Sequence, residues 1–367
     1  MEENFTEKEN QHYIPKFYLR YFSFMDNKKQ IGIYNQSNNI FIPTSKLKTQ
    51  ASKKYFYGKD GIIEDWLASV ESIVAPIFSK MHYEDLPKKM STTQADMLFF
   101  LILLDLRNPI RVNQWIRGRE LIKERLISKN ANNGDSDIVK SIESILTREN
   151  AVETVILNAR GVIPYMMDLD YKLIKNVSKI PFIISDYPLV KYNQFLEKRK
   201  WNIAGHNGYS NIGLQIFLPI NDAYMLVLYD SNVYKVGNRK ENVVEIDYED
   251  SINQLNLLQY LNCSKTIFFN HKISKFYIEK LKNKAKNYQK ANITFSKFYH
   301  VEDENGNIKE NEEVISIGST DLKINLNLQK INFHSKSIAI KLDNKAAQMR
   351  PKAEQYYIYE QKKKNYR

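Results

Sequence analysis

Cysteine is almost absent from this sequence, since Cys263 is the only one among 367 residues. A single cysteine excludes an internal disulfide and a cysteine-rich zinc site, so packing must hold the fold, as is usual in a reducing compartment. Residues 1–12 carry charged side chains such as Glu2, Glu3 and Lys8, which suit neither a signal peptide nor a transit sequence. The sequence therefore predicts a cytoplasmic protein.

Long hydrophobic stretches are also lacking. The apolar run at 97–104 reads MLFFLILL and is closed by Asp105 and Arg107, whereas a membrane-spanning helix needs about 20 apolar residues. We therefore expect no membrane insertion and interpret this run as a helix buried in protein.

The standard catalytic signatures are missing too. The sequence contains no G-x-x-x-x-G-K-[ST], G-x-G-x-x-G, G-x-S-x-G or H-E-x-x-H, which argues against phosphate loops, serine hydrolase elbows and zincins. Arg199 and His206 have the spacing of a class of helical ribonucleases, but Gly205 and Gly208 predict a loop there rather than a helix.

Positive charge is what the sequence has in excess, with 54 Lys and Arg against 42 Asp and Glu and a net charge of +12. Residues 341–367 hold eight basic and three acidic residues, and residues 107–129 hold seven and two, so each stretch has a net charge of +5. Phosphate is the natural partner of such a helix. A solvated helix and a solvated tail are the alternatives. The candidate nucleic-acid contacts on the helix are Arg111, Arg117, Arg119 and Lys123.

Hydrophobic spacing and turn residues predict an α+β fold. It has an N-terminal hairpin, a central helical bundle, and an antiparallel or mixed sheet in the second half with flanking helices. We assign residues 1–300 to a single α+β domain and residues 301–367 to a C-terminal extension with late strands and a basic tail. The predicted strands are 31–34, 40–42, 182–184, 213–218, 223–229, 243–246, 291–299 and 314–318, and the predicted helices are 61–81, 92–107, 109–126, 137–160, 249–262 and 272–287.

Two carboxylates lie in informative places. Asp186 follows a predicted strand and precedes Tyr187-Pro188, where a rigid strand can aim a side chain into a site. An Asx-turn or cap is the alternative. Glu71 flanks the apolar stripe of the first long helix, so its partly desolvated carboxylate must find a cation, a donor or a metal. For Glu71, the alternative is a salt bridge to a nearby arginine.

His12 and Arg20 form a third environment among aromatic side chains that include Tyr13 and Tyr18. Aromatic rings provide a dry wall and a stacking surface, while imidazole and guanidinium provide a proton carrier and a fixed cation. This mixture suits the recognition of an anion or a nucleotide. A packed N-terminal segment in which His12 caps a backbone group is the alternative.

The segment from Gln11 to Phe22 resembles the bacterial domain-of-unknown-function family 4238, whose members open with this histidine, proline and Tyr-Leu-Arg pattern. The resemblance covers about residues 12–270 and brings no established activity. It implies that His12, Arg20, Glu71, Arg107, Asp186 and Asn256 meet in one polar site. Further similar positions are Glu64, Glu71, Arg107-Asn108-Pro109, Ser185-Asp186-Tyr187-Pro188, Leu218-Pro219, Asn256 and Gln259.

The first functional hypothesis is a nuclease or related phosphodiester-acting enzyme in a bacterial anti-phage defence or toxin-like system. His12 would act as general acid or base, and Glu71 with Asp186 would hold a divalent metal such as Mg²⁺ or position water. Arg20 and Arg107 would stabilise phosphate charge, and Asn256 would orient a partner.

The second hypothesis is a sensor or adaptor module without catalytic activity. It would bind nucleic acid, DNA or RNA, or another anion through the 107–129 helix and the aromatic N-terminal segment. The six polar residues would then be a structural network.

Overall fold

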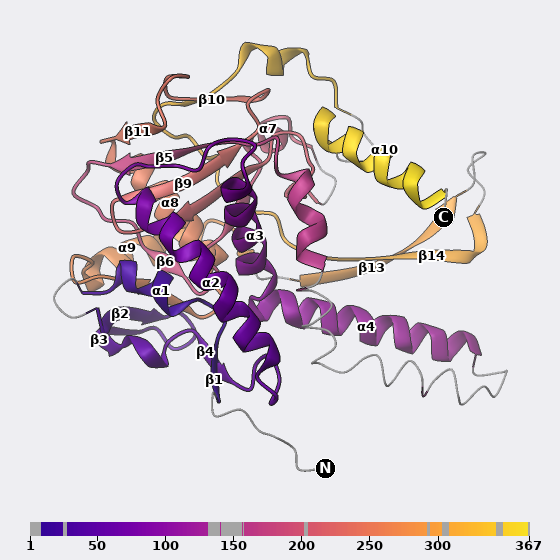
Figure 1. The fold of residues 1–367 in the computed structure, drawn as a ribbon, viewed down its shortest axis with the longest axis horizontal. Coiled ribbons are helices and arrows are strands. Elements are labelled where there is room, and N and C mark those ends of the chain that lie inside the picture. Colours follow the sequence, from indigo (N-terminus) through magenta and orange to yellow (C-terminus); the bar gives the residue numbers. More distant parts are fainter. Residues whose placement is uncertain are drawn as a thin grey trace.

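The N-terminal part forms the predicted hairpin, which becomes half of a four-stranded antiparallel sheet (Figure 1). The computed structural model describes residues 9–24, 28–130, 140, 156, 158–201, 205–291, 294–302, 308–342 and 348–365. Strand β2 (Gln30–Asn35) pairs with β3 (Ile40–Lys46) on one side and with β12 (Thr266–Phe269) on the other, and β12 pairs with β6 (Ile184–Ser185). Distant parts of the chain therefore meet in this sheet.

Short elements surround this hairpin. Strand β1 (Asn10–His12) pairs antiparallel with β4 (Ser52–Lys54). Between them lie the helix α1 (Lys16–Leu19) and the 3₁₀ turns η1 (Arg20–Phe22) and η2 (Leu47–Thr49). The pairing of β1 with β4 holds the opening motif against the end of the hairpin.

Three helices form the predicted bundle: α2 (Ile62–Met81), α3 (Thr92–Leu106) and α4 (Pro109–Asn130). The Ser91 side chain caps α3 by accepting a hydrogen bond from the backbone N–H of Gln94. The apolar run at 97–104 is almost entirely buried in α3, as predicted. No helix among the described segments combines the length and the apolar character that crossing a membrane requires. The predicted helix at 137–160 lies largely outside the described residues.

The second half contains a mixed five-stranded sheet that is built from β5 (Asp170–Asn176), β7 (Val190–Tyr192), β8 (Gln215–Pro219), β9 (Tyr224–Tyr229) and β11 (Val243–Ile246). The strand order is β11-β5-β9-β8-β7, in which β11 and β5 run parallel and the other pairs are antiparallel.

Both faces of this sheet are buried, so successive side chains along a strand point alternately into two apolar cores. Ile216 and Leu226 point into the core that α2 and α3 cover, whereas Phe217 and Val227 point into the core that α8 (Glu249–Asn262) covers. Helix α9 (Lys275–Ala285) packs beside α8. The predicted mixed α+β fold is therefore confirmed.

The C-terminal segment contributes further elements. The predicted late strands are confirmed as β13 (Thr294–Glu302) and β14 (Ile308–Ser319), which form a long ribbon beside α4 (Figure 1). Leu322, Ile324 and Leu328 are buried in the α8 core, so this part of the predicted extension packs against the preceding domain. The remaining elements are η3 (Ile163–Tyr165), α7 (Gln194–Lys198), β10 (Tyr234–Val236), β15 (Ile331–Phe333), η4 (Ser335–Ala339) and α10 (Pro351–Asn365).

A buried ion pair fixes α10 to the body of the protein. Arg350, just before the helix, is 1% exposed, and its Nε and Nη2 donate to the two Asp168 carboxylate oxygens at 2.8 and 3.0 Å. Its guanidinium also donates to backbone carbonyls, including that of Asn211 at 2.9 Å. The basic tail is thus anchored to the body of the protein at this residue.

Candidate functional site

Arg107 and Glu71 meet between α2 and α3, as the sequence motifs imply. Arg107 directly follows α3 and is 1% exposed, and its Nη1 donates to Glu71 Oε1 at 2.9 Å. Its guanidinium lies 5.8 Å from the centre of the Phe100 ring. Among the described residues, Nε and Nη2 of Arg107 have no hydrogen-bond partner. The salt-bridge alternative for Glu71 therefore holds, and Arg107 keeps unused hydrogen-bonding capacity.

His12 lies next to this pair. Burial, followed by the positive charges of Lys16 and Arg107, lowers the pKa of His12 to about 4, so its imidazole is neutral at pH 7. Its Nε2 lies 3.1 Å from the carbonyl oxygen of Lys48 and donates to it in the matching tautomer. The Tyr57 hydroxyl donates to the His12 carbonyl at 3.2 Å. His12, Glu71 and Arg107 thus share one polar neighbourhood.

Asp186 is almost fully buried and its carboxylate is occupied by the backbone. It accepts three hydrogen bonds of 2.7, 2.8 and 3.1 Å from the N–H groups of Ser264, Lys265 and Thr266. Burial raises the pKa of Asp186, and these hydrogen bonds oppose that rise. The Asn108 side chain donates to the Asp186 carbonyl at 2.7 Å, which places this loop beside the α3–α4 junction. The carboxylate therefore makes neither an Asx-turn nor a helix cap; it holds the backbone between α8 and β12, far along the chain.

Asn256 serves a different segment. Its Oδ1 accepts from the Ile183 N–H at 3.1 Å, and its Nδ2 donates to the Pro181 carbonyl at 3.0 Å and the Tyr277 hydroxyl at 2.8 Å. Gln259, one turn later on α8, bonds the same segment through the Ser185 N–H at 3.0 Å. The buried Asn256 side chain therefore holds the backbone just before strand β6 in place.

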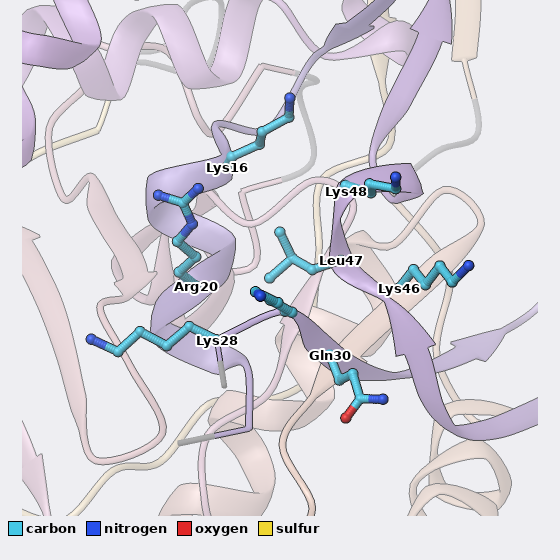
Figure 2. A pocket seen from close by; sticks show the side chains of 8 residues that line it. Lys16, Arg20, Lys28, Gln30, Lys46, Leu47 and Lys48 are labelled. Carbon is cyan, nitrogen blue, oxygen red and sulfur yellow. The ribbon is translucent and has the colours of Figure 1, made fainter. Parts of the chain in front are cut away.

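Arg20 lies apart from the buried cluster, on the wall of a basic groove (Figure 2). The groove encloses about 510 Å³, and the residues that line it are Lys16, Arg20, Lys28, Lys29, Gln30, Lys46, Leu47 and Lys48. Figure 2 shows Lys16 and Arg20 across Leu47 from Lys46 and Lys48. Among these described residues six are cationic and none is acidic. The carbonyl of Lys48 is the one that His12 binds, so the groove and the buried cluster adjoin.

Sequence reasoning missed the five lysines of this groove, although a signal was present. The hairpin register pairs Gln30 with Lys46. Lys28 and Lys29 precede the first strand, and Lys48 follows the second. Any register close to this one therefore places these lysines side by side. The predicted hairpin was therefore sufficient to indicate that these lysines lie close together.

A family model described as a protein of unknown function (DUF4238) matches residues 10–273. The chain belongs to the DUF4238 family. The match includes every motif position considered above, from His12 to Asn256, and so confirms the resemblance seen in the sequence. No curated protein and no solved structure matched the chain.

The predicted nucleic-acid contacts of this DUF4238 protein differ in their availability. Tyr18 is fully buried and its hydroxyl donates to the Pro219 carbonyl, so its ring cannot stack on a base. Tyr13 is partly buried against Phe56. On α4, Arg117 pairs with Glu120 at 3.2 Å and with Glu124 at 3.3 Å.

Other basic residues of α4 also have partners. Arg119 and Lys123 take part in interactions of their own. Arg111 donates to Tyr187 at 2.8 Å and pairs with Asp105. The four basic side chains predicted to contact nucleic acid therefore do not form one unpaired face.

The proposed metal ligands, Glu71 and Asp186, have other partners in this DUF4238 protein. Glu71 Oε1 is bound by Arg107, and both oxygens of Asp186 accept backbone N–H groups. Within the described ranges, no group of three or more His, Cys, Asp or Glu side chains is placed to hold a metal ion. The metal role of these carboxylates stays a prediction that this geometry does not support.

Proposed function

We propose that this protein binds the phosphodiester backbone of a nucleic acid in the basic groove between η1 and the β2–β3 hairpin. The observation that carries the proposal is the set of six lysine and arginine side chains around a groove of about 510 Å³, with no acidic side chain among its described lining residues. Cations that converge on one hollow attract phosphate and release counterions when it binds.

The shape of the groove supports the same partner. Leu47 is buried at its floor, between the lysines and Arg20 that line it. The cationic side chains are exposed and come from three short segments, so they can follow the path of a chain of phosphates. Contacts of this kind set affinity and carry no sequence information. We therefore expect binding with little sequence preference.

Replacing Lys46 and Lys48 together by Gln tests this proposal. The expected result is weaker binding of a short fluorescein-labelled single-stranded DNA. The log–log salt slope should be shallower by about 1.4, since each lost phosphate contact removes about 0.7 on a single strand. Fluorescence anisotropy titrations at several salt concentrations measure the slope. The Lys48 carbonyl that His12 binds remains in the variant.

A matched control removes the same charge elsewhere. Lys362 and Lys363 are exposed on α10, far along the chain from the groove. Their double replacement by Gln should leave the slope within error of the original protein. Equal losses of affinity and of salt slope in the two double variants would contradict a localised site. They would favour binding through charge spread over the surface.

Cleavage of the bound strand is a second candidate function, and one observation favours it. His12 is buried behind the groove residue Lys48, whose carbonyl oxygen lies 3.1 Å from its Nε2, and its neutral imidazole can accept a proton from an attacking water or hydroxyl that reaches it. A role in anti-phage defence or a toxin-like system belongs to this candidate.

Digestion of labelled DNA and RNA, with Mg²⁺ or with a chelator, tests cleavage. His12→Gln keeps an N–H donor for the Lys48 carbonyl but cannot carry a proton. For a nuclease we expect turnover to fall by about 10²–10⁴-fold in this variant with unchanged affinity for the strand. Intact substrate after long incubation with the unaltered protein would exclude nuclease activity on these substrates and leave the binding proposal standing.

A further inference from the structure

The basic groove offers no surface on which a base can stack. None of its described lining residues is aromatic, and Leu47, the apolar side chain at its floor, is buried. Surfaces that bind single-stranded nucleic acid along its length combine a basic track with aromatic side chains under successive bases. The groove therefore suits phosphate groups better than it suits bases.

The groove is also short. Its volume of about 510 Å³ lies in the range of small-molecule sites, and a hollow of that volume is about 8 Å across. Phosphates of one strand are spaced by about 3.4 Å along the axis of a duplex, so the groove covers about two of them. Those phosphates carry one negative charge each, whereas six cationic side chains line the groove. An internal stretch of backbone therefore leaves most of this positive charge unmatched.

A second hollow in the described structure provides a contrast. It has a similar volume of about 520 Å³ and is lined by residues of β10, β11 and β15. Its charged lining residues are two lysines, Lys235 and Lys330, and two glutamates, Glu241 and Glu245. Charge is balanced there, so the excess in the basic groove does not follow from its size.

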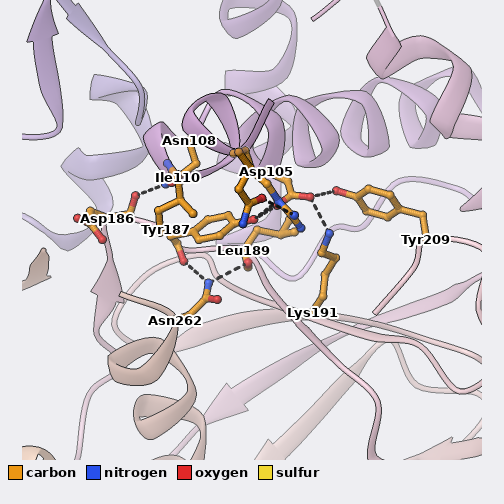
Figure 3. A network of polar contacts seen from close by, with 11 residues as sticks. Asp105, Asn108, Ile110, Asp186, Tyr187, Leu189, Lys191, Tyr209 and Asn262 are labelled. Atoms are coloured by element: carbon orange, nitrogen blue, oxygen red, sulfur yellow. Dashed lines mark hydrogen bonds and ion pairs between the residues drawn. The ribbon is translucent and has the colours of Figure 1, made fainter. Parts of the chain in front are cut away.

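The cluster around Asp105 provides another contrast (Figure 3). Asp105 lies near the end of α3 with its side chain 1% exposed. Lys191 Nζ, on β7, lies 2.8 Å from Asp105 Oδ2, and Arg111 Nε, on α4, lies 3.4 Å from Oδ1. The hydroxyls of Tyr187 and Tyr209 donate to the same carboxylate. These cations face an acidic side chain of the protein itself, whereas the described lining of the groove contains none.

We propose that the basic groove binds the 5′-triphosphate end of an RNA strand. The phosphates would lie between Lys16 and Arg20 on one wall and Lys46 and Lys48 on the other, which face each other across Leu47. This inference rests on the proposed binding of nucleic acid in the same groove and names the part of the strand that enters it.

The charge of a triphosphate matches the groove more closely than internal backbone does. It carries about four negative charges at pH 7, because each inner phosphate keeps one and the terminal phosphate approaches two. These charges are concentrated within a length that the groove can enclose. Lysine and arginine N–H groups make charge-assisted hydrogen bonds to phosphate oxygens, and arginine can do so in a bidentate form. A linear triphosphate also needs no stacking surface.

Three RNA strands of one sequence test the proposal on the full-length protein. They carry a hydroxyl, a monophosphate or a triphosphate at the 5′ end and fluorescein at the 3′ end, and fluorescence anisotropy with a chelator present measures their affinities. We expect the triphosphate strand to bind at least about tenfold more tightly than the hydroxyl strand, with the monophosphate strand between them. Its log–log salt slope should be steeper by about 2, since each further phosphate contact adds about 0.7.

Variants of the two walls locate the preference. Lys16→Gln combined with Arg20→Gln removes the exposed cations of one wall, and the Lys46 and Lys48 double variant described above removes those of the other. Each should lose most of the preference for the triphosphate strand while its circular dichroism spectrum stays that of the original protein. The control pair on α10 should keep the full preference.

Inorganic tripolyphosphate, added as a competitor, distinguishes an RNA end from a free polyphosphate. We expect it to displace the triphosphate strand, but with a lower affinity than an unlabelled triphosphate strand, because the following nucleotides add phosphate contacts. Tighter binding of the inorganic compound than of the RNA would overturn the RNA end as the ligand.

Two further results would overturn the inference. One is equal affinity for the three strands, and if their binding still depended on the groove lysines, the proposed nucleic-acid binding would stand. The other is an equal loss of preference in the wall variants and in the α10 control. Absence of binding by all three strands would contradict the proposed function together with this inference.

Discussion

Arg350→Met is expected to lower the free energy of unfolding by about 3–5 kcal/mol, the usual effect of removing one partner of a buried ion pair. The substitution leaves the Asp168 carboxylate, whose side chain is only 10% exposed, without its two N–H donors. It also frees backbone carbonyls, including that of Asn211, from the guanidinium. Methionine has an unbranched apolar side chain that can fill part of the space, so the loss comes mainly from charge and hydrogen bonding. Urea denaturation followed by circular dichroism measures the change.

Lys352→Met provides the matched control, because Lys352 is exposed on the same helix two residues later. It should change the free energy of unfolding by no more than about 0.5 kcal/mol. If Arg350→Met proved equally mild, the C-terminal segment would not depend on this ion pair. A large effect would show that a residue outside the family match supports the stability of the matched domain.

Asp186→Ala is expected to cost about 3 kcal/mol or more, because each buried donor left without a partner costs about 1–3 kcal/mol. Its carboxylate accepts three backbone N–H groups at Ser264, Lys265 and Thr266. The same denaturation experiment measures the loss. For comparison, Asp247→Ala removes an exposed carboxylate with one side-chain hydrogen bond from Gln329, and should cost about 0.5 kcal/mol or less.

This variant also separates two roles for Asp186. A residue that positions a loop loses stability when it is truncated. A catalytic carboxylate loses turnover while the protein keeps its stability. Unchanged stability in Asp186→Ala would contradict this loop-positioning role and return Asp186 to the set of candidate catalytic residues.

Much of the fold could be predicted because its signals are local. The cap at Ser91, the helical spacing of α8 and the β-branched hairpin each depend on residues close in sequence. The order of the strands could not be predicted in this way, because β2 pairs with β12 and β11 with β5 although several helices and strands lie between them in the sequence. Strands as short as β6 and β7 carry too few residues for a periodic pattern.

The candidate sites were only partly predictable for a related reason. Helical spacing indicates which residues share a face, but it does not identify what that face meets. Arg111 was predicted to face phosphate, yet it pairs with Asp105, which was read only as the end of an apolar run. The partners Lys191 and Tyr209 come from distant segments. The motif residues Glu71 and Arg107, by contrast, form an ion pair, and the charge of Arg107 contributes to lowering the pKa of His12.

The pairing of β2 with β12 has a consequence for the order in which the protein forms during synthesis. The hairpin can close as soon as β3 is made, but β2 ends at Asn35 and its second neighbour begins at Thr266. At about 5–20 residues per second, the inner edge of β2 waits on the order of ten to fifty seconds for its partner. Throughout that time this strand presents unpaired backbone N–H and C=O groups to any other nascent chain. Its Ile31 and Ile33, which are buried in the folded protein, add apolar surface to that edge. We expect mis-pairing at this edge to limit the yield of folded protein more than the assembly of its helices does, since helices form through fast local contacts.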